Sequence, residues 1–167
     1  MSSKPEMMRT KILKIAKKRF FFKEYLQLLQ LERAVKIIKK NEPSNLQISI
    51  LGKFIQEYSN DQKESVNESI TLEVYCKGLL GSSTDFGIFS NPEMGTIFIV
   101  GSLTSMFLHE VEEKALATMS TGPYGILRGL GASQLQTETY LKALNNGSYL
   151  LIVRGNDNKL KILEDIL

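Results

Sequence analysis

Between residues 24 and 40, apolar side chains recur at intervals of three and four, which is the spacing of one face of an α-helix. They are Leu28, Leu31, Ala34, Val35 and Ile38. Pro43 follows, and because proline lacks an amide proton and disfavours helical geometry in the residue before it, the helix is expected to end there. Residues 46–51 then alternate apolar and polar with β-branched side chains, which predicts a strand.

The same order of helix, turn and strand is predicted near the other end of the chain. Ser133 with Gln136 three residues later is a capping-box pattern, in which a hydroxyl and an amide bind free backbone groups at a helix start. Asn146 and Gly147 are typical of a helix end that uses a left-handed residue. Residues 149–153 form a continuous apolar run, which favours a strand covered on both faces.

Further elements are predicted between these two units. Residues 70–76 alternate apolar and polar, which predicts a strand with Cys76 on its buried side. Residues 96–100 are β-branched and aromatic between two glycines, which predicts a second strand. An apolar stripe over residues 104–119 predicts a helix, and the polar run 56–69 predicts an exposed loop.

Two helix–strand units that flank further strands predict a ferredoxin-like α+β sandwich, with a mainly antiparallel sheet and helices on one face. Its first strand is expected within residues 11–23, where the apolar residues allow a strand or a helix. The predicted organisation is a basic N-terminal arm over residues 1–23 and a single α+β domain over residues 24–167. The middle of that domain, about residues 78–131, holds nine of the 12 glycines.

Charge separates the two ends of the chain more than the net charge of +3 suggests. Residues 1–42 hold 12 of the 21 Lys and Arg but only 4 of the 18 Asp and Glu. Within the arm, Lys17, Lys18, Arg19 and Lys23 surround three phenylalanines, a mixture that suits nucleic acid or an anionic membrane. The favoured interpretation is a solvated basic face that docks on the rest of the chain, residues 43–167, where Asp and Glu outnumber Lys and Arg.

Composition excludes several classes of site. One cysteine excludes an internal disulfide framework, and one histidine excludes the common His and Cys zinc cages. No secretory signal is visible, and the longest uncharged apolar run, residues 94–108, is shorter than the roughly 18 to 20 residues that span a bilayer. We therefore expect no transmembrane segment and a cytoplasmic protein, with peripheral membrane attachment left open.

The glycine cluster raises the question of a ligand loop, because glycine allows close approach of the backbone. No G-x-G-x-x-G motif is present, and no P-loop lysine follows Gly81. Turns and packing are therefore the favoured interpretation. The candidate ligand contacts that remain are Gly78, Gly81, Ser82, Ser83, Tyr124 and Gly125, and no cofactor is expected.

Catalytic and metal chemistry have few candidates. His109 and Glu113, one turn apart on the predicted helix, are weak metal candidates, because the zincin motif needs a second histidine. No G-x-S-x-G motif is present, and Cys76 is expected to be a small core residue. We therefore expect no catalytic residues and no enzymatic activity.

The order of these features resembles the bacterial heat-induced general stress protein family. The segments that carry the resemblance are residues 34–38, 45–51, 91–103, 125–131, 140–144, 147 and 150–153. The resemblance implies a ferredoxin-type module with a glycine-rich middle and no established catalytic residues. Three features differ. The family's Pro-Gly-x-Gly turn is here Pro92-Glu93-Met94-Gly95, residues 106–113 are bulky and charged where the family has small residues, and the basic arm has no counterpart.

Three hypotheses of function follow. The first is a stress-associated, non-enzymatic module that acts as a homo-oligomer or binds a protein partner through its sheet or its glycine-rich middle. The second is a small-ligand sensor, with residues 78–83 and 122–125 as the lining. The third is contact with nucleic acid or an anionic membrane through residues 1–23.

Overall fold

The centre of the protein is a five-stranded sheet with the order β1-β7-β2-β4-β3, in which every neighbouring pair is antiparallel. The computed structural model describes residues 17–41, 45–55 and 62–167. The strands of the sheet are β1 (Lys18–Tyr25), β2 (Gln47–Lys53), β3 (Phe86–Asn91), β4 (Gly95–Gly101) and β7 (Tyr149–Asn156). A separate hairpin joins β5 (Glu110–Val111) to β6 (Lys114–Ala115). The predicted α+β class with an antiparallel sheet is confirmed.

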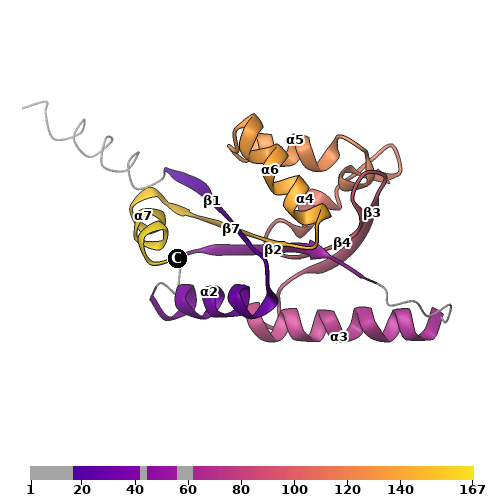
Figure 1. The fold of residues 1–167 in the computed structure, drawn as a ribbon, viewed down its shortest axis with the longest axis horizontal. Coiled ribbons are helices and arrows are strands. Elements are labelled where there is room, and N and C mark those ends of the chain that lie inside the picture. The colour runs from indigo at the N-terminus through magenta and orange to yellow at the C-terminus, as the bar shows by residue number, and fades with distance from the viewer. Residues whose placement is uncertain (1–16, 42–44, 56–61) are drawn as a thin grey trace, which may run out of the picture.

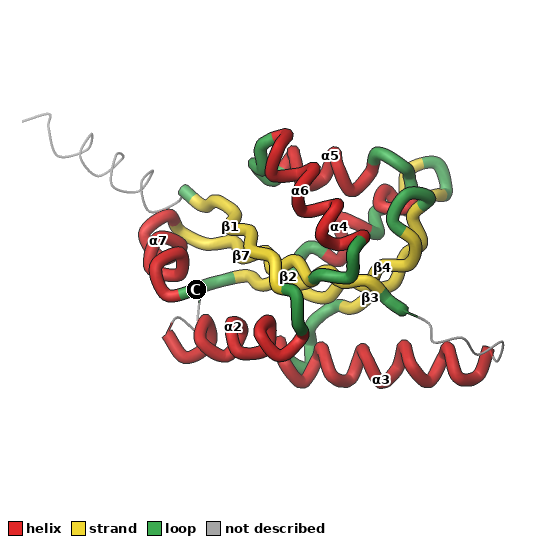
Figure 2. The backbone as a smooth tube through the Cα atoms, viewed as in Figure 1, coloured by secondary structure: helices red, strands yellow, loops and turns green. Residues whose placement is uncertain are grey.

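Helices cover both faces of this sheet, so the prediction of helices on one face is wrong. Figure 1 shows α2 and α3 on one side of the strands and α4, α5 and α6 on the other, and Figure 2 shows the strands as the layer between them. The first side holds α2 (Leu28–Asn41), α3 (Gln62–Leu80) and α7 (Asp157–Ile166). The second holds α4 (Thr104–Phe107), the 3-10 turn η1 (Leu116–Thr118), α5 (Gly122–Gly129) and α6 (Gln134–Asn145).

The inner strands explain why two helical layers are needed. All four residues 97–100 of β4 are buried, and so are residues 150–153 of β7. Because successive side chains of a strand point to opposite faces, such runs need cover on both sides. Ile97 and Ile99 pack with α5 and α6, whereas Phe98 and Val100 pack with α2 and α7.

Both predicted helix–strand units are present. The strand expected at 46–51 is β2, and the apolar run at 149–153 lies in β7. The capping box of α6 forms as predicted, because the Gln136 amide donates to Ser133 Oγ at 3.1 Å and the Ser133 amide donates to Gln136 Oε1 at 2.9 Å. Gly147 has the expected left-handed geometry, with φ of +93°.

The strand predicted at residues 70–76 is wrong, because this segment lies inside the helix α3. A spacing of four residues fits both a strand and a helix, so the alternation did not distinguish them. Cys76 and Leu72 pack toward the sheet, whereas Ile70 and Val74 are 52% and 66% exposed. The loop predicted at 56–69 is wrong from Gln62 onward, and residues 56–61 lie outside the described residues.

The helix predicted at residues 104–119 is also wrong beyond its first turn. The helix α4 ends at Phe107, and the chain then forms the β5–β6 hairpin and the turn η1. Glu112 and Glu113 reverse the chain with φ of 53° and 69°. Two consecutive residues with positive φ make a tight hairpin turn and cannot continue a right-handed helix.

The first strand predicted within residues 11–23 is β1, which begins at Lys18 and pairs with β7 over its whole length. Residues 18–23, assigned to the basic arm, therefore belong to the sheet, and residues 1–16 of that arm lie outside the described residues. In the described part of the chain, no helix has the length and apolar character needed to cross a membrane.

Candidate functional site

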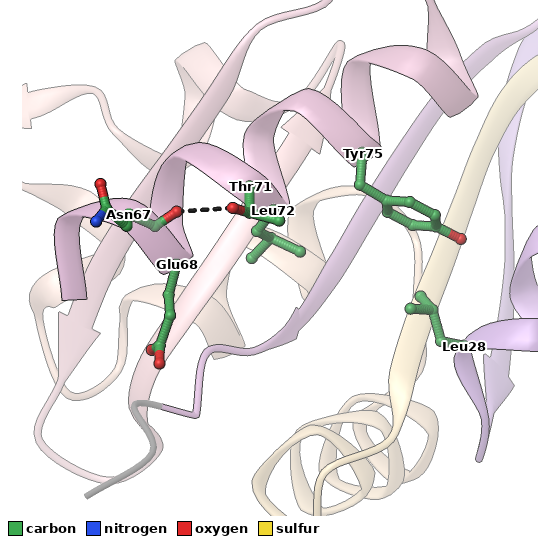
Figure 3. A pocket seen from close by; sticks show the side chains of 6 residues that line it. All are labelled: Leu28, Asn67, Glu68, Thr71, Leu72 and Tyr75. Atoms are coloured by element: carbon green, nitrogen blue, oxygen red, sulfur yellow. Dashed lines mark hydrogen bonds between the residues drawn. The ribbon is translucent and has the colours of Figure 1, made fainter. Parts of the chain in front are cut away.

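A largely apolar pocket lies between the start of α2 and the middle of α3. It has a volume of about 540 Å³. Figure 3 shows Tyr75 of α3 and Leu28 of α2 pointing toward one another across it. The lining residues are Leu28, Asn67, Glu68, Thr71, Leu72 and Tyr75. The polar groups of Asn67 and Thr71 are partly used within α3, because Thr71 Oγ1 donates to the Asn67 carbonyl at 2.9 Å.

Polar contacts join the two helices beside this pocket. The Tyr75 hydroxyl donates to Glu32 Oε2 at 2.8 Å, and Lys36 Nζ donates to Glu32 Oε1 at 2.7 Å. Burial, together with the bond to Glu32, raises the pKa of Tyr75 to about 12. The bonds from Lys36 and Tyr75 lower the pKa of Glu32. Near neutral pH Tyr75 is therefore a neutral donor to a carboxylate, which leaves its ring to line the pocket.

Exposed apolar side chains lie close in sequence to the residues that line this pocket. Leu26, just before α2, and Leu29, in its first turn, are 79% and 54% exposed, and Ile70 and Val74 of α3 are exposed as well. A helix that is apolar both toward the core and toward solvent is typically covered on both sides. We call these residues, with the apolar lining of the pocket, the α2–α3 apolar surface; its members are Leu26, Leu28, Leu29, Ile70, Leu72, Val74 and Tyr75.

The four basic candidates at the N-terminal end do not form a free basic patch. Arg19 Nε lies 2.5 Å from Asp157 Oδ1, and Arg19 Nη2 lies 2.8 Å from Glu164 Oε1. The bond with Asp157 is the main reason that the pKa of Arg19 is raised and that of Asp157 is lowered. Lys23 Nζ donates to the Leu167 carbonyl. Lys17 and Lys18 are exposed, so half of the proposed basic contact is engaged within the protein.

The structure does not bring the two halves of the predicted ligand lining together. Gly78 lies in α3, and Gly81, Ser82 and Ser83 follow that helix. Tyr124 and Gly125 lie in α5, on the opposite side of the sheet (Figure 1). Tyr124 instead lines a second pocket of about 460 Å³. Its other lining residues are Glu93, Met94, Ser120, Thr121, Pro123, Glu138, Leu141, Lys142 and Asn145.

The metal candidates lose the geometry on which they depended. His109 directly precedes β5, and Glu113 lies in the turn of the hairpin, so the two are not one helical turn apart. Within residues 17–41, 45–55 and 62–167, no cluster of three His, Cys, Asp or Glu side chains is placed to hold a metal ion. Cys76 is buried, and burial raises the pKa of its thiol to about 12, so the nucleophilic thiolate is scarce at neutral pH.

The sequence prediction missed the α2–α3 apolar surface because it placed Ile70 and Val74 on the buried side of a strand. A helical interpretation of residues 62–80 separates Ile70 and Val74 from Leu72 and Cys76, and that separation was the available signal. Searches of family models, curated proteins and solved structures find no match to this chain.

Proposed function

We propose that this chain is a non-enzymatic protein-binding module that works by self-association or by binding another protein, and that the α2–α3 apolar surface is its contact. The observation that carries the proposal is the exposure of Val74 and Ile70 beside an apolar pocket. Contiguous exposed apolar surface is uncommon on a monomer and marks interaction sites. The pocket has room for apolar side chains of a partner, and the exposed residues near it would lose their contact with water.

The resemblance to the bacterial heat-induced general stress protein family supports a stress-associated role as part of this proposal. The ferredoxin-like description is proposed with it, in a form that has helices on both faces of the sheet. The buried Cys76 and the separation of His109 from Glu113 support the non-enzymatic assignment. The cytoplasmic location stays a prediction from the sequence.

The test compares the wild-type protein with Val74→Glu and with the control Leu135→Glu. Both side chains are largely exposed, so neither change disturbs the core, but Leu135 lies on α6 at the other face. Sedimentation velocity over a range of concentrations measures self-association, and fluorescence of an anilinonaphthalene sulfonate dye measures accessible apolar surface. We expect Val74→Glu to weaken self-association or, in a monomer, dye binding by about tenfold, as loss of a contact worth about 1.4 kcal/mol would.

The control variant should behave as the wild type in both measurements. A wild-type protein that stays monomeric and binds no dye would overturn the proposal. Equal effects of the two variants would also overturn it, because the contact would then not lie on the α2–α3 face.

A small-ligand sensor is a second candidate, which the pocket around Tyr124 supports. That pocket presents two carboxylates, from Glu93 and Glu138, and the ammonium group of Lys142 around an apolar floor. The chemistry suits a small zwitterion. A native mass spectrum of untagged protein at low salt tests this, since a retained ligand adds mass to each subunit and Lys142→Glu should remove it.

The third hypothesis is contact of residues 1–23 with nucleic acid or an anionic membrane. Among residues 17–23, Arg19 and Lys23 are engaged within the protein, which leaves Lys17 and Lys18 for such a contact. Binding that falls steeply with salt and disappears on deletion of residues 1–16 would support it. That deletion leaves β1 intact, whereas deletion to residue 23 removes all but the last two residues of β1, a strand partner of β7.

A further inference from the structure

In the described part of the chain, β1 is an edge strand with one unpaired side. One side of β1 pairs with β7 along all of Lys18–Tyr25, and no further strand of the sheet lies on its other side among the described residues. In an antiparallel edge strand, alternate residues direct their amide and carbonyl groups away from the sheet. Among the described residues, no backbone hydrogen bond outside the regular elements reaches residues 18–25. Within residues 17–41, 45–55 and 62–167, the outward groups of β1 therefore have no backbone partner.

A groove of about 410 Å³ runs beside the N-terminal half of this edge. It is lined by residues from both faces of the sheet, so it crosses the outer edge of β1. Tyr140 of α6 forms one wall and stacks on Phe22, with ring centroids 5.5 Å apart. Glu164 of α7 forms the other wall, where it pairs with Arg19. The groove gives the outward backbone groups room to meet a strand.

The side chains of β1 are nearly symmetric about Phe21. On the α6 side, Phe20 and Phe22 flank this position, and Lys18 and Glu24 lie one step further out. Lys18 and Glu24 are both exposed, and neither has an ion-pair partner within the described chain. A strand with this pattern is complementary to its own antiparallel copy, because each lysine then meets a glutamate.

We propose that β1 pairs with β1 of a second copy of this chain, antiparallel and on a two-fold axis through Phe21, to form one continuous sheet. This contact is separate from the α2–α3 apolar surface and goes beyond the proposed function. Lys18 of each copy lies opposite Glu24 of the other, and Phe20 lies opposite Phe22. Directly opposed residues share a face, so the two copies keep their α6 helices on the same side.

The charged side chains of β1 on the α7 side are compatible with the same register. Arg19 comes opposite Lys23 of the second copy, but Asp157 and Glu164 already neutralise Arg19 at that place. A register shifted by two residues puts Phe22 on the axis and sets Phe20 against Glu24, so both Lys18–Glu24 pairs are lost. A shift of one residue opposes side chains that point to different faces. Charge complementarity therefore favours the register centred on Phe21.

The first test is a charge exchange at exposed positions, measured by sedimentation velocity on the full chain. Lys18→Glu and Glu24→Lys each replace two attractive pairs by two repulsive ones, so we expect each to weaken the dimer by about tenfold. The double variant K18E/E24K restores the pairs with their signs reversed and should restore wild-type association. Glu110→Lys, an equal change of charge at an exposed position of β5, is the control and should have no effect.

The second test reports the register. Phe21→Cys brings two thiols together across the axis, at the Cα separation of about 4.5 to 5.5 Å that a disulfide accepts. We expect a covalent dimer on mild oxidation. Lys23→Cys is the control. In the proposed register its two new thiols lie several residues apart along the strands, and the only other thiol, Cys76, is buried, so this variant should form no covalent dimer.

A monomeric wild-type protein would overturn the proposal, and so would an oligomer that neither single charge variant weakens. Failure of the double variant to restore association would refute the register. An oligomer that dissociates with Val74→Glu but not with Lys18→Glu would place the second copy on the α2–α3 apolar surface, which supports the proposed function and overturns the β1 contact.

Discussion

The two edges of the sheet are built differently. At one edge, β3 is short; a backbone bond holds the residue before it, and the side chain of its last residue holds the other end. The Asp85 carbonyl accepts from the Gly101 amide at 2.9 Å, and the Asn91 amide group donates to the Ala117 and Met119 carbonyls, each at 2.9 Å. At the other edge, β1 is longer, carries three phenylalanines and borders an open groove.

The difference lies in how the two edge strands are anchored among the described residues: a buried side chain holds the end of β3, whereas surface ion pairs hold β1. Asn91 is 4% exposed, and its Oδ1 also accepts from the Glu93 and Met94 amides at 2.9 and 3.2 Å. One buried amide thus joins the β3–β4 turn to the segment after η1. By contrast β1 is tied to α7 by ion pairs that are partly exposed. Changes at β3 should therefore affect stability, and changes at the outer side of β1 should affect association.

The largest expected effect is at Gly122, which holds η1 against the start of α5. A Cβ atom at this position would lie 1.8 Å from the Leu116 carbonyl oxygen. Because backbone atoms must move to relieve that clash, Gly122→Ala should lower the free energy of unfolding by about 3 kcal/mol. Urea unfolding measures the loss. Gly125→Ala on the same helix is the control, since nothing lies within 4 Å of its added Cβ.

The control should gain stability, by up to about 1 kcal/mol, because alanine is the better helix former. Similar losses in the two variants would show that the η1 contact with α5 does not depend on the absence of a side chain at residue 122.

The next largest effect is expected at Asn91. Asn91→Ala removes two donated and two accepted hydrogen bonds and leaves buried backbone groups without partners, which should cost about 2 to 3 kcal/mol. Ser90→Ala, one residue earlier and exposed, loses only a bond to Thr96 Oγ1 and should change stability little. Urea unfolding at two salt concentrations measures both, and the Asn91 effect should not depend on salt because no charge is removed.

The sequence predicted those parts of the fold in which local and tertiary signals agree. The capping box of Ser133 and Gln136 and the left-handed Gly147 are local chemistry, and β7 is long, apolar and buried on both faces. The segment around Ile70 was mistaken because a spacing of four satisfies both periods, and the packing of α3 on the sheet decides between them. The helix predicted from Thr104 ends at Phe107, and the hairpin that replaces its second half needs positive φ at Glu112 and Glu113, which their residue type disfavours.

The candidate surfaces were less accessible to sequence reasoning. The basic residues near Arg19 were identified, but their partners Asp157 and Glu164 are far along the chain. Neither the free edge of β1 nor the groove beside it follows from local pattern, since both depend on which strand ends the sheet. Tyr124 was grouped with residues 78–83 in one predicted ligand lining, but the topology places these two segments on opposite faces of the sheet.

A smaller effect, and a gain, is expected in the hairpin that leads into η1. Its two turn residues, Glu112 and Glu113, have φ of 53° and 69°, a geometry that Asn-Gly adopts far more readily. The double change Glu112→Asn, Glu113→Gly should therefore stabilise the protein by about 1 kcal/mol. Thermal unfolding measures the gain. The same pair placed at Glu110 and Val111, in β5 rather than the turn, should not stabilise.

The smallest effect is expected at Arg19, and it should depend on pH where that of Asn91 does not. Arg19 lowers the pKa of Asp157 below the ordinary value of 3.8, so the pair contributes stability above that pH and loses it as the pH falls through the folded pKa. Arg19→Gln should therefore lower the urea midpoint at neutral pH, with a difference from wild type that shrinks below pH 3.8 and at high salt. Lys161→Gln, which removes the 3.1 Å pair with the same carboxylate, should show a weaker form of the same profile. A constant difference across the whole pH range would mean that Arg19 supports the β1 edge through the packing of its stem rather than through its charge.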